Sequence, residues 1–245
     1  MRIAQIIPWI FSAAALVLLT QCGSTPQGVQ IPTWQSRLGP VPVTPITPVD
    51  LLEQVHLHQD MIPKGTYGRR YFRPMEVRYI TIHATENPTG DAYHHALALK
   101  HGALRANKRK GGNRIGFLTW HFTAQEDLIY QHLPTNEQGE HADFDGPGNN
   151  YSIGIEMCDF HGNDIPKTID NAAKLAAYLM YEHHLTVDHV VPHYHWRRIG
   201  VTPEHKPCPY FLLDNGKPAA TWDWFLNRVQ AYYQRLIPES PFPRI

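Results

Sequence analysis

The chain has 245 residues, in which 22 lysines and arginines balance 22 aspartates and glutamates. A chain of this length can bury the core of one ordinary domain. Its balanced charge lacks the basic excess typical of nucleic-acid-binding proteins, so we expect no nucleic-acid partner. We infer no obligate protein partner from the sequence. The 16 histidines are more than a chain of this size usually carries, so a metal site has to be chosen among many imidazoles.

The N-terminal residues have the pattern of a bacterial export signal. A charged residue follows the initial methionine, residues 3–20 are almost wholly apolar, and the run ends at Cys22 before small polar residues. This pattern predicts a lipoprotein signal peptide at residues 1–21, whose cleavage would leave Cys22 as the lipidated first residue. Gln21 is larger than the residue usual before that cysteine, and an uncleaved membrane anchor or ordinary cleavage are the alternatives.

All three interpretations place the rest of the chain outside the cytoplasm. The residue after the cysteine is Gly23 rather than aspartate, which favours the outer membrane of a Gram-negative host. We therefore expect an exported protein, attached by lipid to the cell envelope and facing the periplasm, with the membrane as a partner through this anchor.

A proline-rich segment at residues 22–50 follows the signal. Closely spaced prolines prevent a helix and favour an extended chain, so this segment is predicted to be a semi-rigid tether between the membrane and the domain. The domain is expected to span residues 51–245, with its core at about residues 75–235.

Patterns typical of strands and helices alternate loosely along the domain. The expected strands are residues 77–83, 117–122, 127–132, 151–157 and 187–191, and the expected helices are residues 91–106, 168–184 and a last helix from Thr221. Thr168 is the expected cap of the second helix, and the glycine- and asparagine-rich residues 137–150 are expected to form a loop that carries binding residues. This order predicts an α/β fold with a central mixed sheet flanked by helices.

Two cysteines remain if Cys22 carries lipid. An exported protein could join Cys158 and Cys208 in a disulfide. However, Cys208 lies beside residues that are better partners for zinc. Cys158 ends an apolar strand, and we expect it to be a small buried hydrophobic residue.

The segment that contains Cys208 has the composition of a metal site. His193 precedes the thiol by fifteen positions (208 minus 193), and Lys206 precedes it by two. Upstream, the predicted buried strand at residues 77–83 ends on His83. Two imidazoles and one thiolate from separate segments can hold zinc and leave a fourth position open, which distinguishes a catalytic zinc from a structural one.

Several ordered blocks resemble the type-2 zinc N-acetylmuramoyl-L-alanine amidases, the group related to phage amidase lysozymes and peptidoglycan recognition proteins. The blocks are Ile82-His-Ala-Thr85, Thr119-Trp-His-Phe-Thr123, Tyr130-Gln-His-Leu-Pro-Thr-Asn-Glu137, His141-Ala142, Asn150-Tyr-Ser-Ile-Gly-Ile-Glu156 and Lys206-Pro-Cys-Pro209. Each block alone is weak evidence, and their order and spacing carry the resemblance, which looks most like the autolysin and prophage branch.

The resemblance implies a mixed sheet with helices on its faces and a zinc-containing groove on one side. It also implies one Zn²⁺ ion per chain, because His83, His193 and Cys208 match the three zinc ligands of the family. The implied reaction is hydrolysis of the amide between the lactyl group of N-acetylmuramic acid and L-alanine of the stem peptide. The expected substrate is peptidoglycan, as intact wall, shed muropeptides or anhydro fragments.

The resemblance also implies catalytic roles. Glu156 matches a general base, although a structural ion pair is the alternative. Many members use a tyrosine on the neighbouring strand, where this chain has Trp120, and tryptophan has no acidic hydroxyl, so more of the chemistry falls on Glu156. Lys206 matches a lysine that stabilises the oxyanion, and the alternative is an exposed surface lysine.

The expected substrate contacts are His141, Trp120 and Asn150. His141 belongs to a block that helps bind the muropeptide in the family, and Trp120 could pack against the substrate or the core. Glu140 stands where the family often has tryptophan, which leaves fine specificity open. An inactive binding module and a zinc hydrolase of another amide are alternatives that the complete ligand set disfavours.

Overall fold

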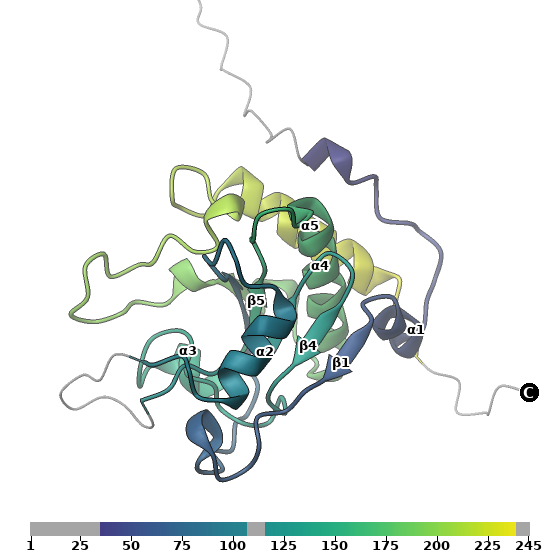
Figure 1. The fold of residues 1–245 in the computed structure, drawn as a ribbon. Coiled ribbons are helices and arrows are strands. Elements are labelled where there is room, and N and C mark those ends of the chain that lie inside the picture. The colour runs from purple at the N-terminus through teal and green to yellow at the C-terminus, as the bar shows by residue number, and fades with distance from the viewer. Residues whose placement is uncertain (1–34, 107–115, 239–245) are drawn as a thin grey trace, which may run out of the picture. The chain divides into compact units, whose positions relative to one another are not determined.

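The computed structural model describes residues 35–106 and 116–238 (Figure 1). The predicted signal peptide and lipidation site, Cys22, lie outside the described residues. No helix within the described ranges is both long enough and apolar enough to cross a membrane.

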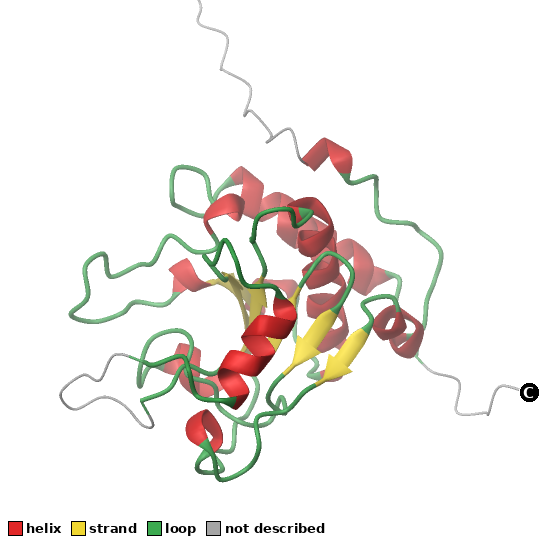
Figure 2. Cartoon of the chain, viewed as in Figure 1, coloured by secondary structure: helices red, strands yellow, loops and turns green. Residues whose placement is uncertain are grey.

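A mixed six-stranded sheet forms the centre of the fold (Figure 2), with strand order β1-β4-β3-β5-β2-β6. The strands are β1 Leu57–Gln59, β2 Tyr79–Ala84, β3 Phe122–Ala124, β4 Ile129–Gln131, β5 Ser152–Met157 and β6 Val190–Pro192. Among these strands only the β3–β4 pair is antiparallel, and it forms a hairpin. The predicted α/β class with a mixed sheet is therefore confirmed.

Helices cover both faces of this sheet. They are α1 Pro48–Glu53, α2 Ala92–Lys100, α3 Pro147–Tyr151, α4 Ile165–Glu182 and α5 Ala220–Gln234. In Figure 1, α2 lies in front of the strands and contacts β3 and β4, whereas α4 and α5 lie behind them and pack against each other. Apolar residues along one face of α4 are buried and pack in one cluster with isoleucines of β2 and β5.

Two helix boundaries differ from the prediction for local reasons. The first helix ends at Lys100 because Gly102 adopts a left-handed backbone with φ of +61°, which terminates helices. The second begins at Ile165, because the Asp164 side chain accepts a hydrogen bond from the Lys167 amide and caps it. The prediction that Thr168 is the cap was wrong.

One helix was not predicted from the sequence. Helix α1 starts within the proline-rich segment, where Thr47 caps it and Pro48 occupies the first turn, a position that tolerates proline. Ile46 is already buried and its amide donates to the Arg235 carbonyl at 2.9 Å. The folded part thus begins before residue 51.

The expected strand at residues 117–122 is regular only from Phe122, since Thr119 forms an isolated bridge with Glu140 instead.

His121 is buried beside β3, as a packed core histidine. Its Nε2 donates to the Glu137 carbonyl at 2.8 Å, and its Nδ1 accepts from the Gly154 amide at 3.0 Å. This tautomer is neutral, and a second proton would meet the Gly154 donor. Burial lowers the pKa of His121 from 6.5 to about 4, although the Glu137 carbonyl acts in the opposite direction.

A depressed pKa in the folded protein makes stability depend on pH. The contribution of His121 is complete above the unfolded pKa of 6.5 and is lost as pH falls from 6.5 towards 4, because the unfolded chain then binds more protons. We expect the free energy of unfolding in urea to fall between pH 7 and pH 5, and the ring signals of His121 in NMR spectra to stay those of the neutral form above pH ~5. His161→Gln, at an exposed position, should leave the pH dependence of the free energy of unfolding and the ring signals of His121 unchanged. An NMR midpoint near 6.5 for His121 would contradict this.

Candidate metal centre

The parallel strands bring the predicted site residues to one edge of the sheet. His83 near the end of β2 pairs in register with Glu156 near the end of β5. His193 follows β6 directly, since Pro192 pairs with Ile82 of β2. Ligand sites of open α/β sheets lie at the carboxyl ends of the strands, so this edge is where a site is expected.

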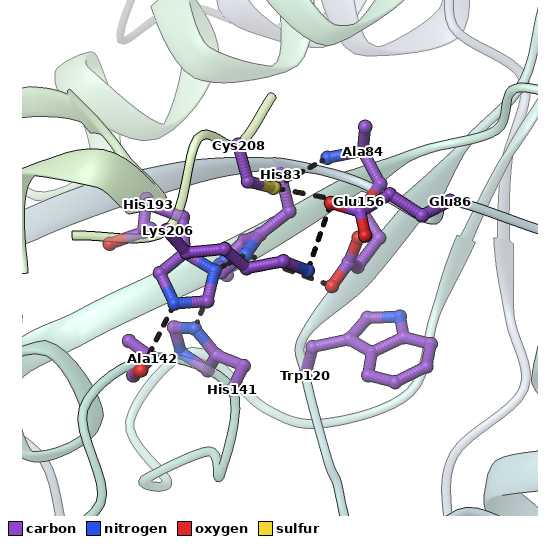
Figure 3. A network of polar contacts seen from close by, with 12 residues as sticks. His83, Ala84, Glu86, Trp120, His141, Ala142, Glu156, His193, Lys206 and Cys208 are labelled. Atoms are coloured by element: carbon purple, nitrogen blue, oxygen red, sulfur yellow. Dashed lines mark hydrogen bonds and ion pairs between the residues drawn. The ribbon is translucent and has the colours of Figure 1, made fainter. Parts of the chain in front are cut away.

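Cys208 reaches the same edge from a distant loop. Its Sγ accepts a hydrogen bond from the Ala84 amide at 3.3 Å, and its carbonyl accepts from the Tyr194 amide at 3.1 Å. The ligand atoms of His83, His193 and Cys208 all lie within 4.8 Å of one another, and all three residues are buried (Figure 3). Cys158 and Cys208 are both free thiols, so the alternative disulfide is not formed.

The two imidazoles turn the same nitrogen towards each other. Nδ1 of His83 lies 2.9 Å from Nδ1 of His193. The opposite nitrogens, both Nε2, face acceptors at 3.0 Å, which are Nδ1 of His141 and the Ala142 carbonyl. With their protons on Nε2, the rings present two lone pairs inward beside a sulfur, a donor set that fits zinc.

Burial keeps this cluster uncharged. It lowers the pKa of His193 to about 3, with Lys206 contributing, and it lowers the pKa of His83 well below 6.5, with His193 and His141 contributing. Burial also raises the pKa of the Cys208 thiol. Neutral imidazoles are the form that binds metals, and a cation would counter the cost of forming the thiolate.

Glu156 combines burial with an unused acceptor. Its Oε1 lies 3.7 Å from Nδ1 of His83, and its side chain is 14% exposed. Its Oε2 has no hydrogen-bond partner among the residues that the structure describes. Burial raises the pKa of Glu156 to about 8, and the Lys206 ammonium opposes that rise. Since its Oε1 approaches His83, the carboxylate faces the cluster.

Lys206 lies over the same cluster (Figure 3). Its Nζ is 3.0 Å from Oε1 of Glu86, and its side chain is 31% exposed. Burial alone would lower the pKa of Lys206, but the Cys208 sulfur and the Glu86 and Glu156 carboxyls outweigh burial and raise it. The ammonium is therefore charged and fixed at the site, unlike that of a solvated surface lysine.

A cavity of about 470 Å³ opens beside this cluster. Its lining includes Glu156, His193 and Lys206. The cavity gives a small molecule access to the carboxylate, the ammonium and one imidazole of the cluster.

The three expected substrate contacts lie in different surroundings. Trp120 lines the cavity, packs in a small buried cluster and donates from Nε1 to Thr123 at 2.7 Å. His141 also lines the cavity, but it is buried and contacts His83. Asn150 is not among the lining residues, and its amide donates to the Asp145 carbonyl at 2.8 Å.

Two residues of the site were not predicted from the sequence. Asn149 lines the cavity in place of its neighbour Asn150, and only the start of α3 shows which of the two faces inward. Glu86 holds the Lys206 ammonium from a turn after β2. No local pattern distinguishes Glu86, because its partner Lys206 is distant in the sequence. The inward position of Asn149 depends on how its own loop folds around His141 and Ala142.

Comparison with known proteins identifies the family. A family model described as N-acetylmuramoyl-L-alanine amidase (Amidase_2) matches residues 73–211. The chain belongs to this amidase family. It is similar to the N-acetylmuramoyl-L-alanine amidase XlyA of Bacillus subtilis (strain 168), at 40% identity over 174 residues covering 70% of this chain and 50% of XlyA. CwlH of the same organism is 35% identical over 181 residues, covering 72% of this chain and 62% of CwlH.

Solved structures of the family support the same fold. The catalytic domain of XlyA superposes with a TM-score of 0.57 at 39% identity, covering 71% of this chain and 99% of that domain. This chain spans half to about three-fifths of the length of XlyA and CwlH. The amidase family therefore accounts for the sheet and the helices.

We expect the metal content of the purified protein to follow the cluster. His83→Ala and Cys208→Ala should each lose most bound zinc, because two remaining donors hold the ion weakly. Cys158→Ala is the matched control, since this buried thiol lies outside the cluster and should leave the zinc content unchanged. Elemental analysis after gel filtration measures the stoichiometry. Equal zinc in the wild type and in both ligand variants would refute the assignment.

Proposed function

We propose that this chain is a zinc-dependent N-acetylmuramoyl-L-alanine amidase that acts on peptidoglycan or its muropeptides. The bond cut is the amide between the lactyl group of N-acetylmuramic acid and L-alanine of the stem peptide. The observation that carries the proposal is the buried cluster of His83, His193 and Cys208 beside Glu156, at the wall of an open cavity. One carboxylate oxygen of Glu156 has no hydrogen-bond partner in the part of the chain that the structure describes. Membership of the amidase family supports the substrate class.

His83, His193 and Cys208 would hold one zinc ion per chain. When bound, zinc supplies a Lewis acid that polarises the scissile carbonyl and acidifies water. The chain itself supplies the proton transfers. Oε2 of Glu156 accepts a proton from the attacking water and passes it to the departing amine of L-alanine. The cation beside it would lower its pKa below the value set by burial, which favours the ionised base.

Lys206 supplies the positive charge for the oxyanion. Glu86 fixes Nζ at 3.0 Å, so the ammonium is already placed before negative charge develops on the carbonyl oxygen. A donor that needs no reorganisation stabilises the transition state more than it stabilises the substrate.

Export and a lipid anchor at Cys22 are part of the same proposal. The charged start, the apolar run and the following cysteine support them. Anchoring in the outer membrane would place the cavity in the periplasm, where peptidoglycan is found. Mass spectrometry of the membrane fraction, with and without Cys22→Ala, tests this through the presence of acyl groups on the first residue.

The role of Glu156 can be separated from metal binding. Glu156→Gln should lower the release of stem peptides from purified sacculi by about 10²–10⁴-fold while zinc content stays at the wild-type level, because the amide has no basic carboxylate. New amino termini of L-alanine report the bond cut. Glu182→Gln, at an exposed position of α4, is the control. Turnover near the wild-type rate with zinc bound would remove Glu156 from the mechanism.

Lys206→Met should lower kcat by on the order of 10²–10³-fold, with a smaller effect on KM, because the charge acts mainly in the transition state. Glu86→Gln should cause a smaller loss, since it frees the ammonium without removing it. A soluble muropeptide assay gives both constants. A rise in KM alone for Lys206→Met would instead indicate ground-state binding.

A further inference from the structure

Two consecutive residues contact both histidines of the cluster from outside. His141 offers Nδ1 to Nε2 of His83, and the next residue, Ala142, offers its carbonyl to Nε2 of His193, each at 3.0 Å. We propose that the dipeptide His141-Ala142 orients both metal-binding imidazoles and sets their tautomers, with His141 acting as a positioning residue. This inference rests on the proposed zinc site, and it assigns His141 a role other than substrate contact.

The direction of each hydrogen bond follows from the acceptors. Nε2 of His141 lies 3.2 Å from the Ser152 carbonyl, and a carbonyl can only accept. The proton of neutral His141 therefore sits on Nε2, and its Nδ1 must accept from His83. Nε2 of His83 then carries the proton and its Nδ1 is left as a lone pair. The chain from His83 through His141 to Ser152 fixes one ligand nitrogen.

The Ala142 carbonyl fixes the other ligand nitrogen in the same way. It accepts from Nε2 of His193, so the lone pair of that ring lies on Nδ1, which faces His83. Both rings thus direct Nδ1 towards each other, beside the Cys208 sulfur. Partners of this kind set the ring orientation and the basicity of metal-binding histidines.

The dipeptide is itself held in place. Oδ1 of Asn149 accepts from the amides of both His141 and Ala142, at 2.8 Å and 2.7 Å. The Asp143 carboxylate in turn accepts from the Asn149 amide at 2.9 Å. One asparagine oxygen therefore fixes the backbone that supports both imidazoles.

Two glycines leave space for the His141 ring. A Cβ atom on Gly154 would lie 2.9 Å from Nδ1 of His141, and one on Gly139 would lie 2.6 Å from its Cδ2. Carbon atoms do not approach this closely, so a side chain at either position would displace the ring. The ring can lie over β5 and reach His83 on β2 because position 154 has no side chain.

The first test compares two substitutions of His141. In His141→Asn, Oδ1 can take the place of Nδ1 and accept from His83, whereas His141→Leu has no acceptor. Competition with a chromogenic chelator gives the dissociation constant for zinc. We expect about 10–100-fold weaker binding for His141→Leu and recovery of most of that loss in His141→Asn. The visible spectrum of the Co²⁺-loaded protein should shift in the leucine variant and not in the asparagine variant.

The second test leaves every ligand and His141 intact. Gly154→Ala should weaken zinc binding as His141→Leu does, because the added methyl group pushes the ring away. Gly39→Ala is the matched control, since a Cβ there meets nothing within 4 Å. Urea unfolding of the metal-free forms, measured in parallel, shows whether each variant is folded. Dissociation constants for zinc are compared only among folded variants.

The outcomes separate this inference from the proposed function. A wild-type protein that binds no zinc would overturn both. Zinc binding of wild-type strength and an unshifted Co²⁺ spectrum in His141→Leu would overturn the inference alone, and a raised KM in that variant would then assign His141 to substrate contact. Binding by His141→Asn as weak as that of His141→Leu would also overturn it, because the acceptor would then be irrelevant.

Discussion

The parallel pairing of β2 with β5 on one side and β6 on the other is the constraint on which the site depends. It sets His83 level with Glu156 and brings His193 to the same edge. Side chains alternate along a strand, so Ile80 and Ile82 enter the core while His83 points to the opposite face, where it meets His193. A shift of one residue in the register would turn the His83 imidazole into the apolar core and separate it from His193 and Cys208.

Burial gives this edge its chemistry. It lowers the pKa of His83 and His193 and raises the pKa of Cys208 and Glu156, so all four groups favour their neutral forms. A divalent cation reverses the balance for the thiol and the carboxyl group but not for the imidazoles, which bind metals when neutral. Metal binding at this edge is therefore coupled to release of protons, and a rise in pH favours it.

The sequence predicted those parts of the fold that local patterns determine. The apolar spacing of α4 and the buried run of β2 are properties of neighbouring residues, and both elements were predicted at nearly the right positions. Helix α1 was missed because its prolines suggested an extended chain, although a capped first turn accepts proline. The resemblance to the amidase family predicted His83, His193 and Cys208 as metal ligands, and the structure places their nitrogen and sulfur atoms close together.

What local patterns could not give were the contacts between distant segments. His141 and Asn149 belong to a loop whose binding role was expected, but the hydrogen bonds to His83 and to the dipeptide amides depend on how that loop folds over β5. The same holds for Glu140, which stands where the family often has tryptophan. It is buried, and its carboxylate lies 3.5 Å from the Arg73 guanidinium. A buried carboxylate needs such a partner, and no sequence pattern places an arginine beside it.

The turn after β2 shows how the fold holds the Lys206 ammonium. Glu86 adopts a left-handed backbone with φ of +50°, which is costly for a residue with a side chain. Asp159, beyond the end of β5, accepts hydrogen bonds from the Thr85 hydroxyl at 2.7 Å and from the Asn87 amide at 3.0 Å. The residues on both sides of Glu86 are thus fixed by one carboxylate, and the turn is closed in the conformation that carries Glu86 to Lys206. The position of the ammonium therefore depends on the same β2–β5 pairing that aligns His83 with Glu156.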